Sequence, residues 1–261
     1  MRRTFILSAI FVICQVSAFG QKKYEMVVEK TDGTEITVNV EDIVRTFFRE
    51  RTDGAGNDDA GETTCPDSNH PHWIDLGLPS GTKWACCNVG ASAPEQYGDY
   101  YAWGETSPKS VYNEVSYSYF TGQDTDGDGW IDTNFSVVNI GSDIAGTQYD
   151  AATANWGSPW CMPSLAQIKE LKESCTSTWT TQNGVNGRKF VGPNGGAVFL
   201  PAAGYRWDGE VYYAGSYGYY WSSTLNESNP SNAYYPYFHS GVAYWSNGPR
   251  RFSGHTVRPV R

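Results

Sequence analysis

Alternating carboxylates between residues 124 and 132 are the side chains of this sequence best suited to bind a metal ion. The predicted ligands are Asp124, Asp126, Asp128, the backbone carbonyl of Trp130, and Asp132. A glycine at the sixth position permits the sharp turn of a calcium loop, and a hard cation needs six or more oxygen ligands. Phe135 stands where a full EF-hand has its bidentate Glu. We therefore predict a structural calcium ion in an acidic loop; the alternative is a solvated acidic turn.

The side chains that could carry catalysis form no recognisable set. Glu105, Asp208 and Glu210 are scattered along the chain without the arrangement of an acid/base pair. His70 and His72 flank one proline and have no acidic or cysteine partner nearby, which favours an ordinary surface turn over a metal site. We therefore expect that the protein is not an enzyme.

The cysteines indicate disulfides rather than thiol redox chemistry. Those beyond the amino-terminal segment are Cys65, Cys86, Cys87, Cys161 and Cys175. No C-x-x-C pair is present, which removes the simplest redox and zinc-ribbon interpretations. In an oxidising compartment these residues could form up to two disulfides and leave one thiol, and the sequence leaves their pairing open.

The segment from about 208 to 255 has the composition of a binding surface. Tyr gives large, rigid contact area at low entropic cost, and Ser, Gly and Asn add adaptable hydrogen bonds. The candidate ligand-binding residues are Tyr212, Tyr213, Tyr219, Tyr234, Tyr235, Tyr237, His239, Tyr244, Ser246, Phe252 and His255. Alternation predicts that Tyr235, Tyr237 and His239 share one strand face. Trp221 and Trp245 are predicted to be core residues; the alternative is that the tyrosines also fill the core.

Short elements must position these residues. Ser164 and Gln167 form a capping-box pattern that predicts a helix over 164–174, and a weaker helix is expected over 150–155. Short strands divided by Gly or Asn are predicted over 189–191, 197–200, 219–223 and 256–260. The layout predicts an α+β fold with few helices.

The amino-terminal part predicts export. Arg2 and Arg3 precede an apolar run and small residues, which is typical of a signal peptide over 1–20. No later run reaches the ~20 apolar residues of a membrane helix. Because Cys14 lacks a small residue before it, a lipid anchor is the less favoured alternative. We expect a protein that is secreted or displayed on the outer cell surface.

Domain boundaries follow from turns and polarity. We predict a β-hairpin with an Asp32-Gly33 turn over residues 21–50. A flexible linker is predicted over 51–64, and the main domain over 65–261. A net charge of −9 argues against nucleic acid or an anionic membrane as the partner.

Several motifs in this order resemble the Fibrobacter succinogenes major paralogous domain. They occupy 72–84, 101–105, 154–157, 200–205, 220–223 and 257–260. The resemblance covers about 70–261 and implies a C-type lectin-like fold with short twisted strands and long loops. It also implies a fold-level relation to formylglycine-generating enzymes. Those oxidases use a pair of cysteines, whereas the last cysteine here is Cys175, so an oxidase is an unfavoured alternative.

The carboxyl-terminal region also resembles the variable region of proteins diversified by retroelements. Adenine-directed mutagenesis of Asn-type codons does not produce Lys, Gln or Met, and these residue types last occur at Lys189, Gln182 and Met162. The resemblance implies a protein or glycan ligand on another cell or on a phage or host surface, and an oligomer is possible. The alternative is a structural or adhesive surface protein of the same fold.

Overall fold

The computed structural model describes residues 12–14, 24–29, 35–39, 72–246, 248 and 250–261, with side chains for 72–244, 248 and 250–261. The chain divides into two units, Met1–Ala55 and Gly56–Arg261. The predicted linker 51–64, His70 and Cys65 lie outside the described residues.

The first unit contains a small antiparallel sheet. Strand β2 (Tyr24–Glu29) pairs antiparallel with β3 (Glu35–Asn39), which is the pairing that the predicted hairpin requires; its Asp32-Gly33 turn lies outside the described residues. Strand β1 (Val12–Cys14) pairs with the other edge of β2. Because β1 falls within the segment 1–20, removal of that segment as a signal peptide stays a prediction.

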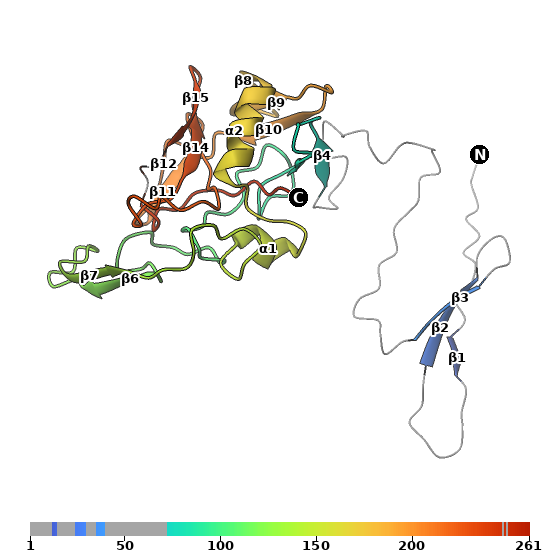
Figure 1. Ribbon diagram of the computed structural model, residues 1–261, viewed down its shortest axis with the longest axis horizontal. Helices are drawn as coiled ribbons and strands as arrows, with labels where there is room; N and C mark the ends of the chain where they lie inside the picture. Colours follow the sequence, from blue (N-terminus) through green and yellow to red (C-terminus); the bar gives the residue numbers. More distant parts are fainter. Residues whose placement is uncertain (1–11, 15–23, 30–34, 40–71, 247, 249) are drawn as a thin grey trace, which may run out of the picture. The chain divides into compact units, whose positions relative to one another are not determined.

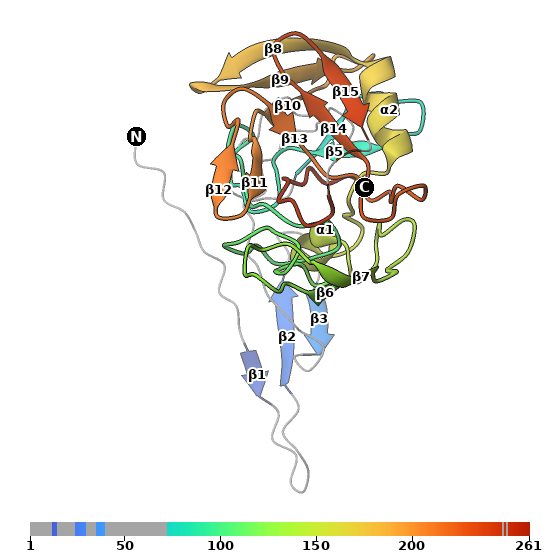
Figure 2. The same ribbon diagram turned by 90° about the vertical axis from the view of Figure 1, so that its left-hand side faces the viewer.

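The second unit is built from small antiparallel sheets and two described helices, which is an α+β architecture (Figures 1 and 2). Two-stranded sheets are formed by β4 (Trp73–Asp75) with β5 (Lys83–Ala85), β6 (Phe120–Gln123) with β7 (Thr133–Val137), and β11 (Tyr205–Trp207) with β12 (Glu210–Tyr212). Three-stranded sheets are formed by β8 (Thr176–Gln182), β9 (Val185–Val191) and β10 (Ala197–Pro201), and by β13 (Gly218–Tyr219), β14 (Tyr235–Phe238) and β15 (Ala243–Ser246).

Local capping signals place both helices where the sequence predicts them. Helix α2 (Leu165–Ser174) begins after Ser164, which forms a complete capping box with Gln167. Helix α1 (Ala151–Trp156) begins after Asp150, whose carboxylate accepts from two backbone N–H groups of the first turn. In Figure 2, α2 flanks the sheet that contains β14 and β15.

The core joins these elements through large rings and aliphatic side chains. One cluster packs α2 against the strands around it and includes Ile168, Val198 and Phe238. A second cluster contains Trp103 and Trp221. Trp221 is fully buried, which confirms its predicted core position, whereas the side chain of Trp245 lies outside the described side chains.

The carboxyl-terminal strands are shorter than predicted. Of the segment 219–223, only Tyr219 belongs to a strand, β13, and the segment 256–260 forms isolated bridges instead of a ladder. Val260 bridges to both Trp84 and Cys161, and Thr256 bridges to Tyr220. The backbone of this segment also bonds to β5 and the residues after it, since the N–H groups of Lys83, Ala85 and Val89 donate to the carbonyls of Arg261, Pro259 and Val257. Pro259 has no N–H with which to return a bond, so the pairing does not extend into a ladder.

Candidate functional site

Aromatic side chains form a continuous surface across the strands from β11 to β15, which we call the tyrosine face. Its members are Tyr205, Tyr212, Tyr213, Tyr217, Tyr219, Tyr235, Tyr237, His239 and Tyr244. Neighbouring rings have centroids between 5.1 Å and 6.4 Å apart. These spacings lie within the range of favourable aromatic pairs.

Strand register creates the centre of this face. Tyr237 in β14 lies opposite Tyr219 in β13 and Tyr244 in β15, with ring centroids 5.9 Å and 5.3 Å away. Tyr235 in β14 and His239, the residue after its end, continue the row, in agreement with the predicted alternation. Phe238 faces the other way and is buried against core rings.

The tyrosines of this protein separate into two classes. On the face, the outer rings of Tyr212, Tyr213 and Tyr244 are 41%, 56% and 46% exposed. In the core, Tyr112 and Tyr220 are buried, and each hydroxyl donates to a backbone carbonyl at 2.6 Å and 2.7 Å. Core tyrosines therefore satisfy their polar end within the protein, while the outer rings of the face present theirs to solvent.

Burial shifts the pKa of two phenols at the centre of the face. Burial, followed by the proximity of Tyr235, raises the pKa of Tyr219 far above its ordinary value of 10.0. Burial likewise raises the pKa of Tyr205. These hydroxyls stay protonated and can both donate and accept hydrogen bonds.

Two predicted contact residues belong to the core, which corrects their assignment to the binding surface. Phe252 is fully buried, and His255 is 1% exposed. His255 stacks on Trp221 and lies beneath Tyr205, Tyr219 and Tyr235 of the face. Burial lowers its pKa to about 3, so the imidazole is neutral.

Two further predicted residues lie outside the tyrosine face, and two members of the face were not predicted. Tyr234 is half-buried and contacts no described ring of the face, and the side chain of Ser246 lies outside the described side chains. The sequence reasoning missed Tyr205 and Tyr217. Tyr217 could have been found from its alternation with Tyr219, because residues two apart in a strand lie on the same face.

The acidic loop that joins β6 to β7 gathers three of its five predicted calcium ligands. Ligand oxygens of Asp124, Asp126 and Asp128 lie within 4.8 Å of one another. Asp124 accepts from two backbone N–H groups of the loop, which lower its pKa. Asp132 is not a member of this group, and its Oδ2 instead accepts from the N–H and the hydroxyl of Thr125, at 2.7 Å each.

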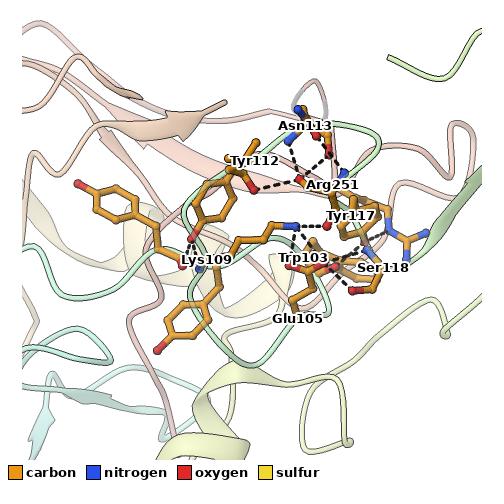
Figure 3. A network of polar contacts seen from close by, with 12 residues as sticks. Trp103, Glu105, Lys109, Tyr112, Asn113, Tyr117, Ser118 and Arg251 are labelled. Carbon is orange, nitrogen blue, oxygen red and sulfur yellow. Dashed lines mark hydrogen bonds and ion pairs between the residues drawn. The ribbon is translucent and has the colours of Figure 1, made fainter. Parts of the chain in front are cut away.

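A buried polar network anchors the chain that leads into the last residues (Figure 3). The guanidinium of Arg251 lies 4.8 Å from the Trp103 ring, and its Nε donates to the Tyr117 hydroxyl at 2.8 Å. Next to it, Lys109 pairs with Glu105 at 2.8 Å, and burial lowers the pKa of this lysine. Arg251 is 1% exposed and Tyr117 is 2% exposed, so these groups serve packing rather than contact with a ligand.

The described cysteines differ in their surroundings. Sγ atoms of Cys86 and Cys87 lie 3.8 Å apart in the core. Cys161 and Cys175 are free thiols, and burial raises the pKa of each to about 11. A thiol with such a pKa is protonated at neutral pH and is a poor nucleophile.

Comparison with known proteins gives one match. The family described as a domain of unknown function, DUF8237, matches residues 168–260. This span contains all of the tyrosine face and leaves out the acidic loop. No curated protein and no solved structure matches the chain. Neither helix in the described part of the chain has the length and apolar character needed to cross a membrane.

Proposed function

We propose that this chain is a secreted or surface-displayed ligand-binding protein with a C-type lectin-like domain, and that the tyrosine face is its binding surface. The continuity of aromatic rings over five strands carries the proposal. Rigid aromatic contact area loses little conformational entropy when a ligand binds, which is why Tyr dominates evolved binding surfaces. The ligand is a protein or a glycan on another surface.

The arrangement favours binding over catalysis. The acid/base candidates Glu105 and Lys109 are committed to each other and to neighbouring groups of the core network. The neutral His255 is covered by rings of the face. A general acid or base must reach its substrate, and these groups do not.

Part of the division between surface and scaffold supports a retroelement origin of the face. The rewritable types Tyr and His occupy exposed or half-exposed positions of the face and Trp221 is fully buried, whereas Phe252 and His255, which are also of rewritable types, lie in the core. A nearby reverse transcriptase gene and an adenine-rich near-copy of the coding segment for 208–255 are the expected genomic signs. Absence of both from the locus would remove the retroelement part of the proposal and leave the binding part standing.

The binding surface is tested with peptides selected on the protein and with alanine substitutions in the tyrosine face. Peptides selected from a phage-displayed library on the full chain should lose binding when Tyr235, Tyr237 and Tyr244 are replaced together by Ala. A matched control, Phe135→Ala, removes a 41% exposed ring that lies outside the face and should keep binding. Equal loss in both variants, or no loss in the triple variant, would contradict the proposal.

The structural or adhesive alternative predicts a different result. If the rings serve assembly, the triple variant changes the oligomeric state measured by light scattering. If they serve a ligand, the oligomeric state stays the same and only ligand capture is lost. A large fall in melting temperature would instead identify the rings as packing residues.

Calcium is proposed as a structural ion of the acidic loop. The support is the closeness of the three aspartate side chains and the exposed, oxygen-rich character of the loop. The ion would stiffen the β6–β7 hairpin, because it would neutralise carboxylates that otherwise repel one another.

A further inference from the structure

An open depression of about 280 Å³ lies where the β6–β7 hairpin meets the carboxyl-terminal segment. It is lined by Glu114, Trp130, Ile131, Phe135 and Arg250. None of these residues belongs to the tyrosine face. The volume is close to the lower end of the range for small-molecule sites, roughly 300 Å³, and the lining combines exposed rings with a pair of opposite charges.

The charged pair is fixed in place. Glu114 is 4% exposed, its Oε1 accepts from Arg250 at 2.8 Å, and its Oε2 accepts from the backbone N–H of Ile131 at 3.1 Å. The Arg250 side chain is 43% exposed, and a guanidinium has five N–H donors, so further donors remain available. A buried acceptor and a partly exposed donor therefore stand side by side.

The rings at the rim are fixed as well. Trp130 packs against Trp207 and Phe252, with centroids 5.6 Å and 5.9 Å away, and is still 38% exposed. Phe135 packs edge to face on Phe120 and is 41% exposed. Burial of these rings by a ligand would cost little conformational entropy, because the protein already holds them.

We propose that this depression binds the pyranose ring of a neutral saccharide. The C–H groups of a pyranose suit contact with the rings of Trp130 and Phe135. Its vicinal hydroxyls can donate to Glu114 and accept from Arg250, which are charge-assisted hydrogen bonds.

Charge selects against ionic ligands at this place. Glu114 and Arg250 neutralise each other, so an ion gains little net attraction there. The carboxylates of the acidic loop, in the same hairpin, repel anions. A neutral polyhydroxylated ring uses both partners without disrupting their ion pair.

The test is saturation-transfer NMR and calorimetry on the full chain with calcium present. The probes are methyl glycosides of glucose, mannose, galactose and N-acetylglucosamine, titrated through the millimolar range. At least one should bind saturably, with transfer strongest at the protons of one ring face. Arg250→Met and Trp130→Ala should weaken binding at least tenfold. Trp130→Tyr keeps a ring and should retain part of the affinity that Trp130→Ala loses. This variant separates the loss of a ligand contact from a loss of folding.

The control lies outside both surfaces. Val211→Ala changes a 40% exposed side chain that belongs to neither the depression nor the tyrosine face, and it should bind the glycosides as the unaltered chain does. Peptide capture by the triple tyrosine variant is measured separately, so failure of this site and failure of the proposed function are distinguishable. The assignment is overturned if no glycoside binds saturably, or if binding is indifferent to both Arg250→Met and Trp130→Ala. Tighter binding of methylguanidinium or of methyl glucuronate than of every neutral glycoside would also overturn it.

Discussion

The indole of Trp221 and the imidazole of His255 stack with ring centroids 4.1 Å apart and planes 14° apart. This pair forms the floor under the tyrosine face, because His255 also contacts Tyr205, Tyr219 and Tyr235. His255 is 1% exposed, and its Nδ1 has no hydrogen-bond partner among the described residues. The neutral imidazole is the stable form here, because burying an imidazolium charge without a partner costs free energy.

The burial of His255 predicts that acid destabilises the protein. Its pKa is about 3 in the folded chain, below the ordinary value of 6.5, so between these limits the unfolded chain binds more protons. The contribution of His255 is fully present above pH 6.5 and is lost as the pH falls towards 3, with a slope of up to about 1.36 kcal/mol per pH unit. Urea unfolding at a series of pH values measures this slope.

His255→Phe is the matched variant for this prediction. It keeps a flat ring against Trp221 and cannot titrate. We expect it to reduce the loss of stability between pH 6.5 and 4.5, while carboxylates continue to contribute at lower pH. The same pH dependence in both proteins would show that His255 is accessible to protons in the fold.

Arg258 should be a large contributor to stability although no carboxylate accepts from it among the described residues. Its guanidinium is 1% exposed and donates to Asn88 Oδ1 at 2.8 Å and to the carbonyls of Cys86 and Phe199 at 2.6 Å and 2.9 Å. Arg258→Met leaves these buried acceptors without this donor, and we expect a loss of at least about 3 kcal/mol in the free energy of unfolding.

Arg261→Met is the control for that variant. Arg261 is exposed and lies over the rings of Trp73 and Trp160. Its replacement should cost about 1 kcal/mol or less. Comparable losses in the two variants would mean that the network around Arg258 is not the source of the effect.

The contact between Gly218 and Phe238 predicts that β13 tolerates no side chain at position 218. A Cβ atom there would lie 2.2 Å from the Phe238 ring, which is buried and cannot move away. Gly218→Ala should therefore cost about 1–3 kcal/mol by overpacking. Gly209→Ala meets nothing within 4 Å and should change thermal stability little; a similar cost for both would attribute the effect to backbone entropy.

Calcium should stabilise the chain through the acidic loop. At a concentration a hundredfold above the dissociation constant, the gain is about 2.7 kcal/mol, measured as a rise in melting temperature that chelation reverses. Asp124→Asn combined with Asp128→Asn should abolish the rise. Asp132→Asn should weaken it less, because Oδ2 of Asp132 is already bonded to Thr125.

The control for calcium lies outside the loop. Asp143 is exposed and accepts from the backbone N–H of Ala145, a bond that Asn can also accept. Asp143→Asn should leave the response to calcium unchanged. If the unaltered chain shows no change in melting temperature with calcium, the loop is a solvated acidic turn.

The sequence by itself determined those features that depend on neighbours within a few residues. The capping box of Ser164 and Gln167, the cap at Asp150 and the closeness of Asp124, Asp126 and Asp128 each follow from short spacings along the chain. The same holds for the alternation that puts Tyr235 and Tyr237 on one side of β14.

Only the tertiary structure decided which aromatic residues are surface and which are core. Phe252 and His255 are aromatic like the residues of the face, yet segments far away in sequence cover them, as the bridge between His255 and Tyr101 shows. Likewise, Oδ2 of Asp132 accepts from Thr125 instead of joining the other carboxylates. Residues 256–260 form isolated bridges instead of a strand. Burial depends on which distant segments pack over a side chain, and composition and periodicity carry no information about that packing.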